Sequence, residues 1–288
     1  EYLYEGMREK GLDIHKWEQT TKKNMPTKQW LQEYECSFLG TGETFVEGDV
    51  LKQISQQTSE KYYTKYNNRM RVWQDPQPQY NYMIACDTSL GRDRDYSAFH
   101  VINMYNGQQV AEFYSNRTPI NDFAKILSTE GMLYNIAHII CERNTIGNNL
   151  IDWLYNMYEY ENLWADDKGE LGFQVTAKNR DSILAELEEA IRTDLIKINS
   201  TRTCDELMTF IITEGGRVQA ERGHHDDLVM SLALAVTAYK NLIDTSPIDF
   251  VSRIDKMEAP AMPSKHYKPK LKTSFGAMSE EDYRWIMK

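Results

Sequence analysis

Short apolar runs that end on a carboxylate form the clearest pattern along this chain. The first run ends on Asp87 and is followed by a polar turn around Gly91, after which the residues alternate as in a second strand paired antiparallel with the first. A later run is apolar almost throughout, as is typical of a strand buried on both faces, and it ends on Glu142. Strands are therefore expected at residues 80–87, 98–102, 109–114 and 137–142, with shorter ones at 171–175 and 195–198.

Apolar residues at helical spacing separate the later strands. One helix is expected after Pro119, because apolar residues recur there at i, i+3 and i+4. From Leu228 onward the chain is apolar nearly all round, which predicts a buried helix that begins at Asp226 and Asp227. This order of elements predicts an α/β fold with a mixed central sheet flanked by helices on both faces. Further helices are expected after Gly147, over residues 181–193, and around Leu207, Met208 and Ile211.

Polar and proline-containing stretches divide the chain into three parts. Residues 1–79 are interpreted as an irregular linker segment with one short helix at 27–39, and the stretch 74–79 closes it. The core domain is expected to span residues 80–243. Residues 244–288 carry four prolines and no long periodic pattern, so we expect an extended tail that ends in a short docking helix.

The composition is that of a soluble globular protein, with 41% hydrophobic and 26% charged residues and no apolar run of membrane-spanning length. The net charge of −10 argues against a protein that coats nucleic acid nonspecifically, although an enzyme acting on nucleic acid stays compatible with it. The chain begins with Glu1 rather than Met, which indicates a piece of a larger or processed protein. Four cysteines without a CxxC pair are expected as buried thiols in a reducing compartment: Cys36, Cys86, Cys141 and Cys204.

Carboxylates at three places in the sequence are expected to converge. If the strands that end on Asp87 and Glu142 are parallel neighbours, both side chains meet at one edge of the sheet, where ligands bind in open α/β folds. Asp226 and Asp227 start a buried helix, whose unpaired N–H groups stabilise anions. Each residue alone is more often a turn or cap residue, but clustered carboxylates repel one another unless cations lie between them. Such oxygen ligands suit Mg²⁺ or Mn²⁺, and two of these ions about 3.5–4 Å apart are the usual arrangement for in-line attack on a phosphodiester.

Other polar residues near these carboxylates carry weaker signals. Asp95 either caps a strand or adds an auxiliary ligand, while His224 and His225 are given at most a supporting role beside the metal. The nearby cations are individually most often solvated surface charges, but as a set they could hold DNA phosphates without reading bases. These cations are Arg92, Arg94, Arg143, Lys178, Arg180 and Arg222.

Three segments together resemble the C-terminal nuclease domain of large terminase subunits, the DNA-packaging motors of tailed bacteriophages. The match covers roughly residues 25–240, and the upstream stretch 34–40 is similar to the passage that leaves the terminase ATPase domain. The segments are Met83-Ile84-Ala85-Cys86-Asp87 with Gly91 and Asp95-Tyr96-Ser97-Ala98, then Ile140-Cys141-Glu142-Arg143-Asn144-Thr145-Ile146-Gly147, and His225-Asp226-Asp227-Leu228-Val229-Met230-Ser231-Leu232.

The resemblance implies a ribonuclease-H-like fold and a metal-dependent endonuclease that cuts concatemeric viral DNA in the host cell cytoplasm. The acidic positions of the family map onto Asp87, Glu142 and the Asp226–Asp227 pair, with Asp227 preferred as the principal ligand of that pair and Asp95 as an auxiliary one. The resemblance also implies two Mg²⁺ or Mn²⁺ ions as cofactors and double-stranded DNA as substrate. Through the full-length protein it implies a portal protein and a small terminase subunit as partners.

One departure from the family limits what this chain is expected to do. Full-length members carry an N-terminal ATPase with a GxxxxGK[ST] phosphate loop, which is missing here, so the chain should cut DNA without translocating it. Three alternatives stay open. The first is a resolvase or transposase of the same fold, although no helix-turn-helix or zinc module is seen. The second is a non-catalytic module that docks on a portal ring. The third is an actin- or sugar-kinase-type phosphotransferase, which needs glycine-rich phosphate loops where only Gly91 is available.

Overall fold

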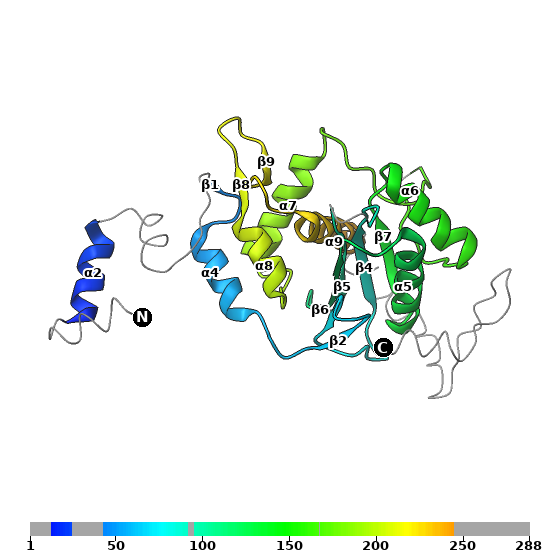
Figure 1. Cartoon of the computed structure of the whole chain (residues 1–288), viewed down its shortest axis with the longest axis horizontal. Coiled ribbons are helices and arrows are strands. Elements are labelled where there is room, and N and C mark those ends of the chain that lie inside the picture. Colours follow the sequence, from blue (N-terminus) through cyan, green and yellow to red (C-terminus); the bar gives the residue numbers. More distant parts are fainter. Residues whose placement is uncertain (1–12, 25–42, 92–94, 167, 245–288) are drawn as a thin grey trace.

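A six-stranded mixed sheet forms the centre of the protein (Figure 1). The computed structural model describes residues 13–24, 43–91, 95–166 and 168–244. Across the sheet the strands follow the order β2-β3-β6-β5-β4-β7. Their bounds are Tyr63–Lys65 for β2, Met70–Val72 for β3, Tyr82–Asp87 for β4, Ser97–Asn103 for β5, Gln109–Ser115 for β6 and His138–Cys141 for β7.

The two strands that lead to Asp87 and Glu142 are parallel neighbours in this sheet. β4 pairs in parallel with β7, with Cys86 opposite Cys141, so the residue after each cysteine lies at the same edge. A parallel pair needs a crossover connection, which β5, β6 and a helix supply here. The predicted parallel pairing is therefore confirmed, as is the antiparallel return of β5 beside β4.

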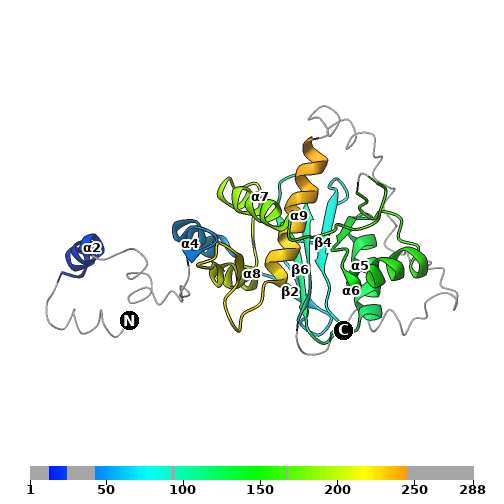
Figure 2. The same cartoon turned by 90° about the horizontal axis from the view of Figure 1, so that it is seen from above.

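Helices cover both faces of the sheet (Figure 2). Helices α7, α8 and α9 lie on one face, and α5 and α6 lie on the other. The predicted α/β class with helices on both faces is thus confirmed. The bounds are Ile120–Leu133 for α5, Thr145–Asp152 for α6, Arg180–Arg192 for α7, Thr201–Met208 for α8 and Asp227–Asp244 for α9, with a π-helical turn at Trp153–Met157 after α6.

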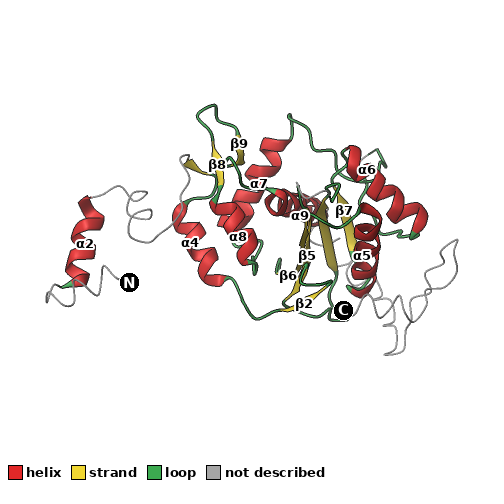
Figure 3. Ribbon diagram, viewed as in Figure 1, coloured by secondary structure: helices red, strands yellow, loops and turns green. Residues whose placement is uncertain are grey.

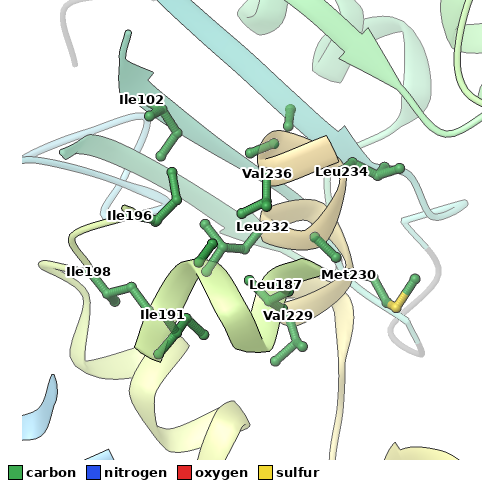
Figure 4. Close-up of a cluster of buried hydrophobic side chains, with 14 of the residues drawn as sticks. Ile102, Leu187, Ile191, Ile196, Ile198, Val229, Met230, Leu232, Leu234 and Val236 are labelled. Atoms are coloured by element: carbon green, nitrogen blue, oxygen red, sulfur yellow. The ribbon is translucent and has the colours of Figure 1, made fainter. Parts of the chain in front are cut away.

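Residues of β4 alternate between two hydrophobic cores, because successive side chains of a strand point to opposite faces. Met83 and Ala85 belong to the core shared with α7 and α9, whereas Ile84 and Cys86 belong to the core under α5 and α6. Figure 4 shows the first of these cores, where side chains of α9 and α7 pack together against the sheet. Helix α9 is buried over most of its length, as its nearly continuous apolar sequence predicts.

The central sheet extends upstream of residue 80, where the core was expected to begin. Strand β3 pairs with β6, and β2 pairs with β3, so both belong to the same sheet as the predicted core strands. A second, three-stranded sheet has the order β1-β8-β9 and joins another upstream strand to a hairpin (Figure 3). The remaining bounds are Ile14–Asn24 for α2, Glu43–Thr44 for β1, Gly48–Gln57 for α4, Phe210–Ile212 for β8 and Val218–Ala220 for β9.

Some expected elements differ from the structure. Residues 171–175 and 195–198 form only isolated bridges, such as those of Phe173 to Glu142 and of Lys197 to Gln108, instead of strands. Ile211, expected on a helix, lies in β8, because α8 ends at Met208 and the chain then turns into the hairpin. The expected helix at 27–39 and the tail after residue 244 lie outside the described residues. Within the described part of the chain, no helix is long and apolar enough to cross a membrane.

Candidate active site

Asp87 and Glu142 meet at the edge of the sheet where β4 and β7 end. Their carboxyl groups share a hydrogen bond, and the backbone N–H of Glu142 donates to Cys86 O over 3.2 Å. Asp87 Oδ1 also accepts from the N–H of Thr88 at 2.7 Å, which fixes its orientation at the strand end. Two carboxylates brought this close cannot both ionise easily without a cation between them.

The turn after Glu142 is built to hold this carboxylate in place. Asn144 caps α6, because its Oδ1 accepts from Ile146 N at 3.0 Å and from Gly147 N at 2.7 Å. Gly147 is required here, since a Cβ at this position would lie 1.8 Å from Glu142 O. The backbone of the first helical turn therefore packs directly against the carbonyl of the candidate ligand.

The third carboxylate position lies at the start of α9. Asp227 is 9% exposed, accepts a hydrogen bond from the backbone of Tyr96, and has His225 Nδ1 3.5 Å from its Oδ2. Asp226 is turned to another partner, because Arg180 Nη2 lies 3.3 Å from its Oδ2. Of the two aspartates, Asp227 is the one whose negative charge acts on Asp87. This difference favours Asp227 over Asp226 as the ligand that faces Asp87.

The pKa values of all three carboxyl groups are raised. Burial raises the pKa of Asp87 well above its usual range, and the charges of Glu142 and Asp227 raise it further. Burial likewise raises the pKa of Glu142. Burial raises the pKa of Asp227 to about 7, with smaller contributions from the charges of Asp226 and Asp95. Burial and mutual repulsion thus disfavour the charged forms of these carboxyl groups, which Arg180 offsets only in part at Glu142.

The residue types fit a hard divalent cation, because Asp87, Glu142 and Asp227 offer carboxylate oxygens whose mutual repulsion would be relieved by positive charge. In the described conformation, however, no three His, Cys, Asp or Glu side chains are arranged to hold an ion, within the ranges given above.

The predicted phosphate-binding cations fall into three groups. Arg180 and Arg143 are engaged within the protein: Arg180 Nη1 donates to Val218 O at 2.6 Å, and Arg143 pairs with Asp166 at 3.1 Å and with Glu170. Lys178 and Arg222 are exposed. Arg92 and Arg94 lie outside the described residues, while the auxiliary candidate Asp95 and His224 are exposed near the site.

Three residues beside the site were missed by sequence reasoning. Glu206 of α8 accepts the N–H groups of Leu228 at 2.8 Å and Val229 at 3.2 Å, so another helix caps α9. The rings of Tyr96 and Tyr114 stack with centroids 4.0 Å apart next to Asp227. The available signal for Glu206 was a glutamate on the apolar stripe of a short amphipathic helix, directly before the buried Leu207.

Comparisons with known proteins point to one group. The chain is 24% identical over 233 residues to a terminase large subunit of Thermus virus P23-45 and 23% identical to that of Thermus phage G20c, each match covering 78% of this chain. It spans only 44% of the length of either relative. No family model matches the chain.

Solved structures with a similar fold are also large terminase nucleases. The large terminase nuclease from thermophilic phage G20c with bound cobalt superposes with a TM-score of 0.54 at 20% identity, covering 69% of this chain and 98% of that one. The nuclease domain of the Thermus phage P74-26 large terminase gives a TM-score of 0.50 at 22% identity, covering 66% and 95%. The resemblance to large terminase subunits is thus confirmed, and the fold is the ribonuclease-H-like fold of their nuclease domain.

Proposed function

We propose that this chain, which has the fold of the large-terminase nuclease domain, is a metal-dependent endonuclease that hydrolyses phosphodiester bonds of double-stranded DNA. The observation that carries the proposal is the placement of Asp87 and Glu142 at one edge of two parallel strands, with Asp227 close enough to act on Asp87. That edge is where open α/β sheets bind their ligands. Related terminase nucleases bind cobalt or magnesium, which supports a divalent cation here.

Asp87, Glu142 and Asp227 would hold two Mg²⁺ or Mn²⁺ ions, with Asp226 and Asp95 as further oxygen donors. When bound, such cations supply the positive charge that activates water and stabilises the leaving oxygen. The chain's own contribution is to fix the carboxylates: Thr88 N–H orients Asp87, and the backbone of Tyr96 orients Asp227. Loss of the Asp87–Glu142 hydrogen bond would free both groups as ligands.

The DNA backbone is proposed to run past the exposed cations beside this edge. Lys178 and Arg222 are exposed and free to contact phosphates without disrupting the fold. Arg143 and Arg180 would reach phosphate only by exchanging their present carboxylate partners, so they serve first to position Asp166 and Asp226. Arg92 and Arg94 complete the proposed set.

In its biological setting we place this activity in genome packaging, as the nuclease that cuts concatemeric viral DNA in the host cell cytoplasm. The proposed division has residues 1–79 as the link from an ATPase domain, 80–243 as the nuclease and 244–288 as a tail. The portal protein and small terminase subunit would be reached through the full-length protein. Because the chain lacks a phosphate loop, no ATPase activity is expected from it.

The test is cleavage of supercoiled plasmid in Mg²⁺, Mn²⁺ or EDTA by the parent chain and by Asp87→Asn. The parent should nick and linearise DNA only with metal, and Asp87→Asn should lose this activity. The matched control is Asp194→Asn, which makes the same change at an exposed aspartate paired with Lys197. Asp194→Asn should cut as the parent does. A folded parent that cuts with neither metal would refute the proposal and favour a docking module that only binds a portal.

A further inference from the structure

Leu228 directly follows the candidate ligand Asp227, and both polar groups of its backbone are held by buried side chains from other elements. Its N–H donates to Glu206 Oε2 of α8 at 2.8 Å. Its carbonyl oxygen lies 2.9 Å from His100 Nε2 of β5. The first N–H groups of a helix have no partner within the helix, so contacts of this kind decide where the helix begins.

The hydrogen-bond pattern fixes which nitrogen of His100 carries the proton. Gln109 Oε1 accepts from the backbone N–H groups of Asn199 at 2.8 Å and Ser200 at 2.9 Å. Because those groups can only donate, the amide nitrogen of Gln109 must face His100 Nδ1, which lies 2.7 Å away. Nδ1 therefore accepts, Nε2 carries the hydrogen, and His100 donates to Leu228 O.

His100 and Gln109, which together form a hydrogen-bonded relay from the sheet to Leu228, lie fully inside the protein. His100 and Gln109 are each 0% exposed, and they belong to adjacent strands of the central sheet. The relay thus transmits the position of the rigid sheet to the first turn of α9. The loop that precedes Asp227 is half-buried or exposed over residues 221–226, so it constrains that turn less than the buried relay does.

We propose that His100 and Gln109 are positioning residues for Asp227: they fix the backbone of Leu228 so that the Asp227 carboxylate faces Asp87. The inference rests on the proposed function, because it takes Asp227 as a ligand of the divalent cation. Partners in the outer shell of a metal site that orient a ligand typically change metal affinity about 10–100-fold when removed. Substituting these residues should therefore weaken metal binding in a chain that still folds.

The experiment measures Mn²⁺ binding to the full 288-residue chain by titration calorimetry, together with thermal unfolding and plasmid cleavage across Mn²⁺ concentrations. The key variant is His100→Leu. The matched control is His138→Leu, on β7, where the imidazole bonds Asn162 at 2.8 Å at the strand end remote from Glu142. A third variant, His100→Gln, keeps an N–H donor near the position of Nε2.

We expect both leucine variants to lower the unfolding temperature, but only His100→Leu to weaken Mn²⁺ binding, by about tenfold or more. His100→Gln should restore most of that affinity. If His100→Leu does not fold, Gln109→Met decides instead, because it leaves the imidazole without the partner that fixes its proton, and the same loss of affinity is expected.

Unchanged Mn²⁺ affinity in a folded His100→Leu or Gln109→Met chain would overturn the inference and leave these residues with a structural role. A parent that binds Mn²⁺ but does not cut DNA would refute the proposed nuclease while the positioning role is still decided by the binding data. A parent that binds no Mn²⁺ would overturn the positioning role as well.

Discussion

The surroundings of two buried carboxylates on the central sheet, Glu112 and Asp87, shift their pKa values in opposite directions. Burial alone would raise the pKa of Glu112 on β6, yet Arg202 and neighbouring groups lower it below the usual range. Arg202 Nε donates to Glu112 Oε1 at 2.7 Å, Arg202 Nη2 forms an ion pair with the same oxygen at 2.6 Å, and Thr203 Oγ1 donates to Oε2 at 2.7 Å. Both oxygens of the buried Glu112 carboxylate thus have a partner inside the protein.

Asp87 on β4 is buried as well, but in the part of the chain that the structure describes no guanidinium offsets the cost of burying its charge. Burial raises the pKa of Asp87, and its carboxylate neighbours Glu142 and Asp227 raise it further. No Lys or Arg among the described residues forms an ion pair with it. The comparison teaches that this chain supplies a guanidinium where a carboxylate serves the fold, and we infer that it leaves the Asp87 site to a cation from solution.

The largest effect expected from this comparison is on stability. Glu112→Gln should lower the free energy of unfolding by about 3–5 kcal/mol, because it removes the buried carboxylate that pairs with the partly buried Arg202 charge. The isosteric Asp87→Asn should not destabilise the metal-free protein, since it removes one of several repelling charges. Denaturant unfolding in EDTA measures both. A comparable loss in the two variants would erase the distinction between the carboxylates.

The next effect concerns added metal. At a free Mn²⁺ concentration about 100 times the dissociation constant, binding should stabilise the parent by about 2.7 kcal/mol. Glu112→Gln should keep this gain, because its site carboxylates are intact, whereas Asp87→Asn should lose most of it. Thermal unfolding with Mn²⁺ and with EDTA gives the two values for each protein. Equal stabilisation of Asp87→Asn and parent would place the cation elsewhere.

A smaller effect is expected from Gly147→Ala. The new Cβ would lie 1.8 Å from Glu142 O, so the turn must move, and overpacking of this kind typically costs about 1–3 kcal/mol. Because the displaced group belongs to a candidate ligand, metal affinity should fall together with stability. Gly169→Ala, where no atom lies within 4 Å of the added Cβ, controls for the change of residue, although its φ of +79° adds strain of its own. Unaltered metal affinity in a destabilised Gly147→Ala would separate this turn from the site.

The smallest effect is the pH dependence set by the Glu112 cluster. The pKa of Glu112 and that of His100 both lie below their unfolded values of about 4.3 and 6.5. For His100, burial is the main cause, and the facing charges are Glu112 and Arg202. A depressed pKa gives stability that is complete above the unfolded value and is lost as pH falls through the folded one.

In EDTA the raised pKa values of Asp87, Glu142 and Asp227 add stability as pH falls from about 7 toward about 4, so the contribution of Glu112 shows below about 4.3. There the free energy of unfolding should fall with pH by about 1.4 kcal/mol for each unit by which the pKa of Glu112 is depressed. Glu112→Gln should flatten this low-pH part of the profile. A profile identical to that of the parent would show that Glu112 does not contribute its charge to stability.

The candidate site residues that can be located from the sequence are those at which an apolar run begins or ends. Asp87 and Glu142 end apolar runs, and Asp227 begins one, so each is visible as a break in periodicity. His100 and Glu112 lie inside strands that read as ordinary alternation, and nothing local indicates that Arg202, 90 residues away, approaches Glu112. Pairing between distant residues is a property of the fold and is not written in local composition.

The second sheet shows a similar limit. The spacing of Leu207, Met208 and Ile211 continues a helical pattern, but the chain leaves α8 and forms a hairpin closed by Gly215 and Gly216. The β-branched Ile211 and Ile212 were the counter-signal, which a three-residue strand is too short to make decisive. Partner strand β1 comes from far upstream, so the sheet could not be foreseen from this stretch alone.

The crossover that makes β4 and β7 parallel also determines how late in synthesis the three carboxylates can come together. Asp87 leaves the ribosome well before Glu142, and Asp227 follows later still, so the carboxylates cannot meet until β5, β6 and α5 have formed and α9 has docked. At about 5–20 residues per second this interval lasts on the order of ten to thirty seconds. If the chain has the proposed nuclease activity, a nascent chain cannot cut DNA during that time, and ribosome-bound chains stalled before α9 should show no cleavage.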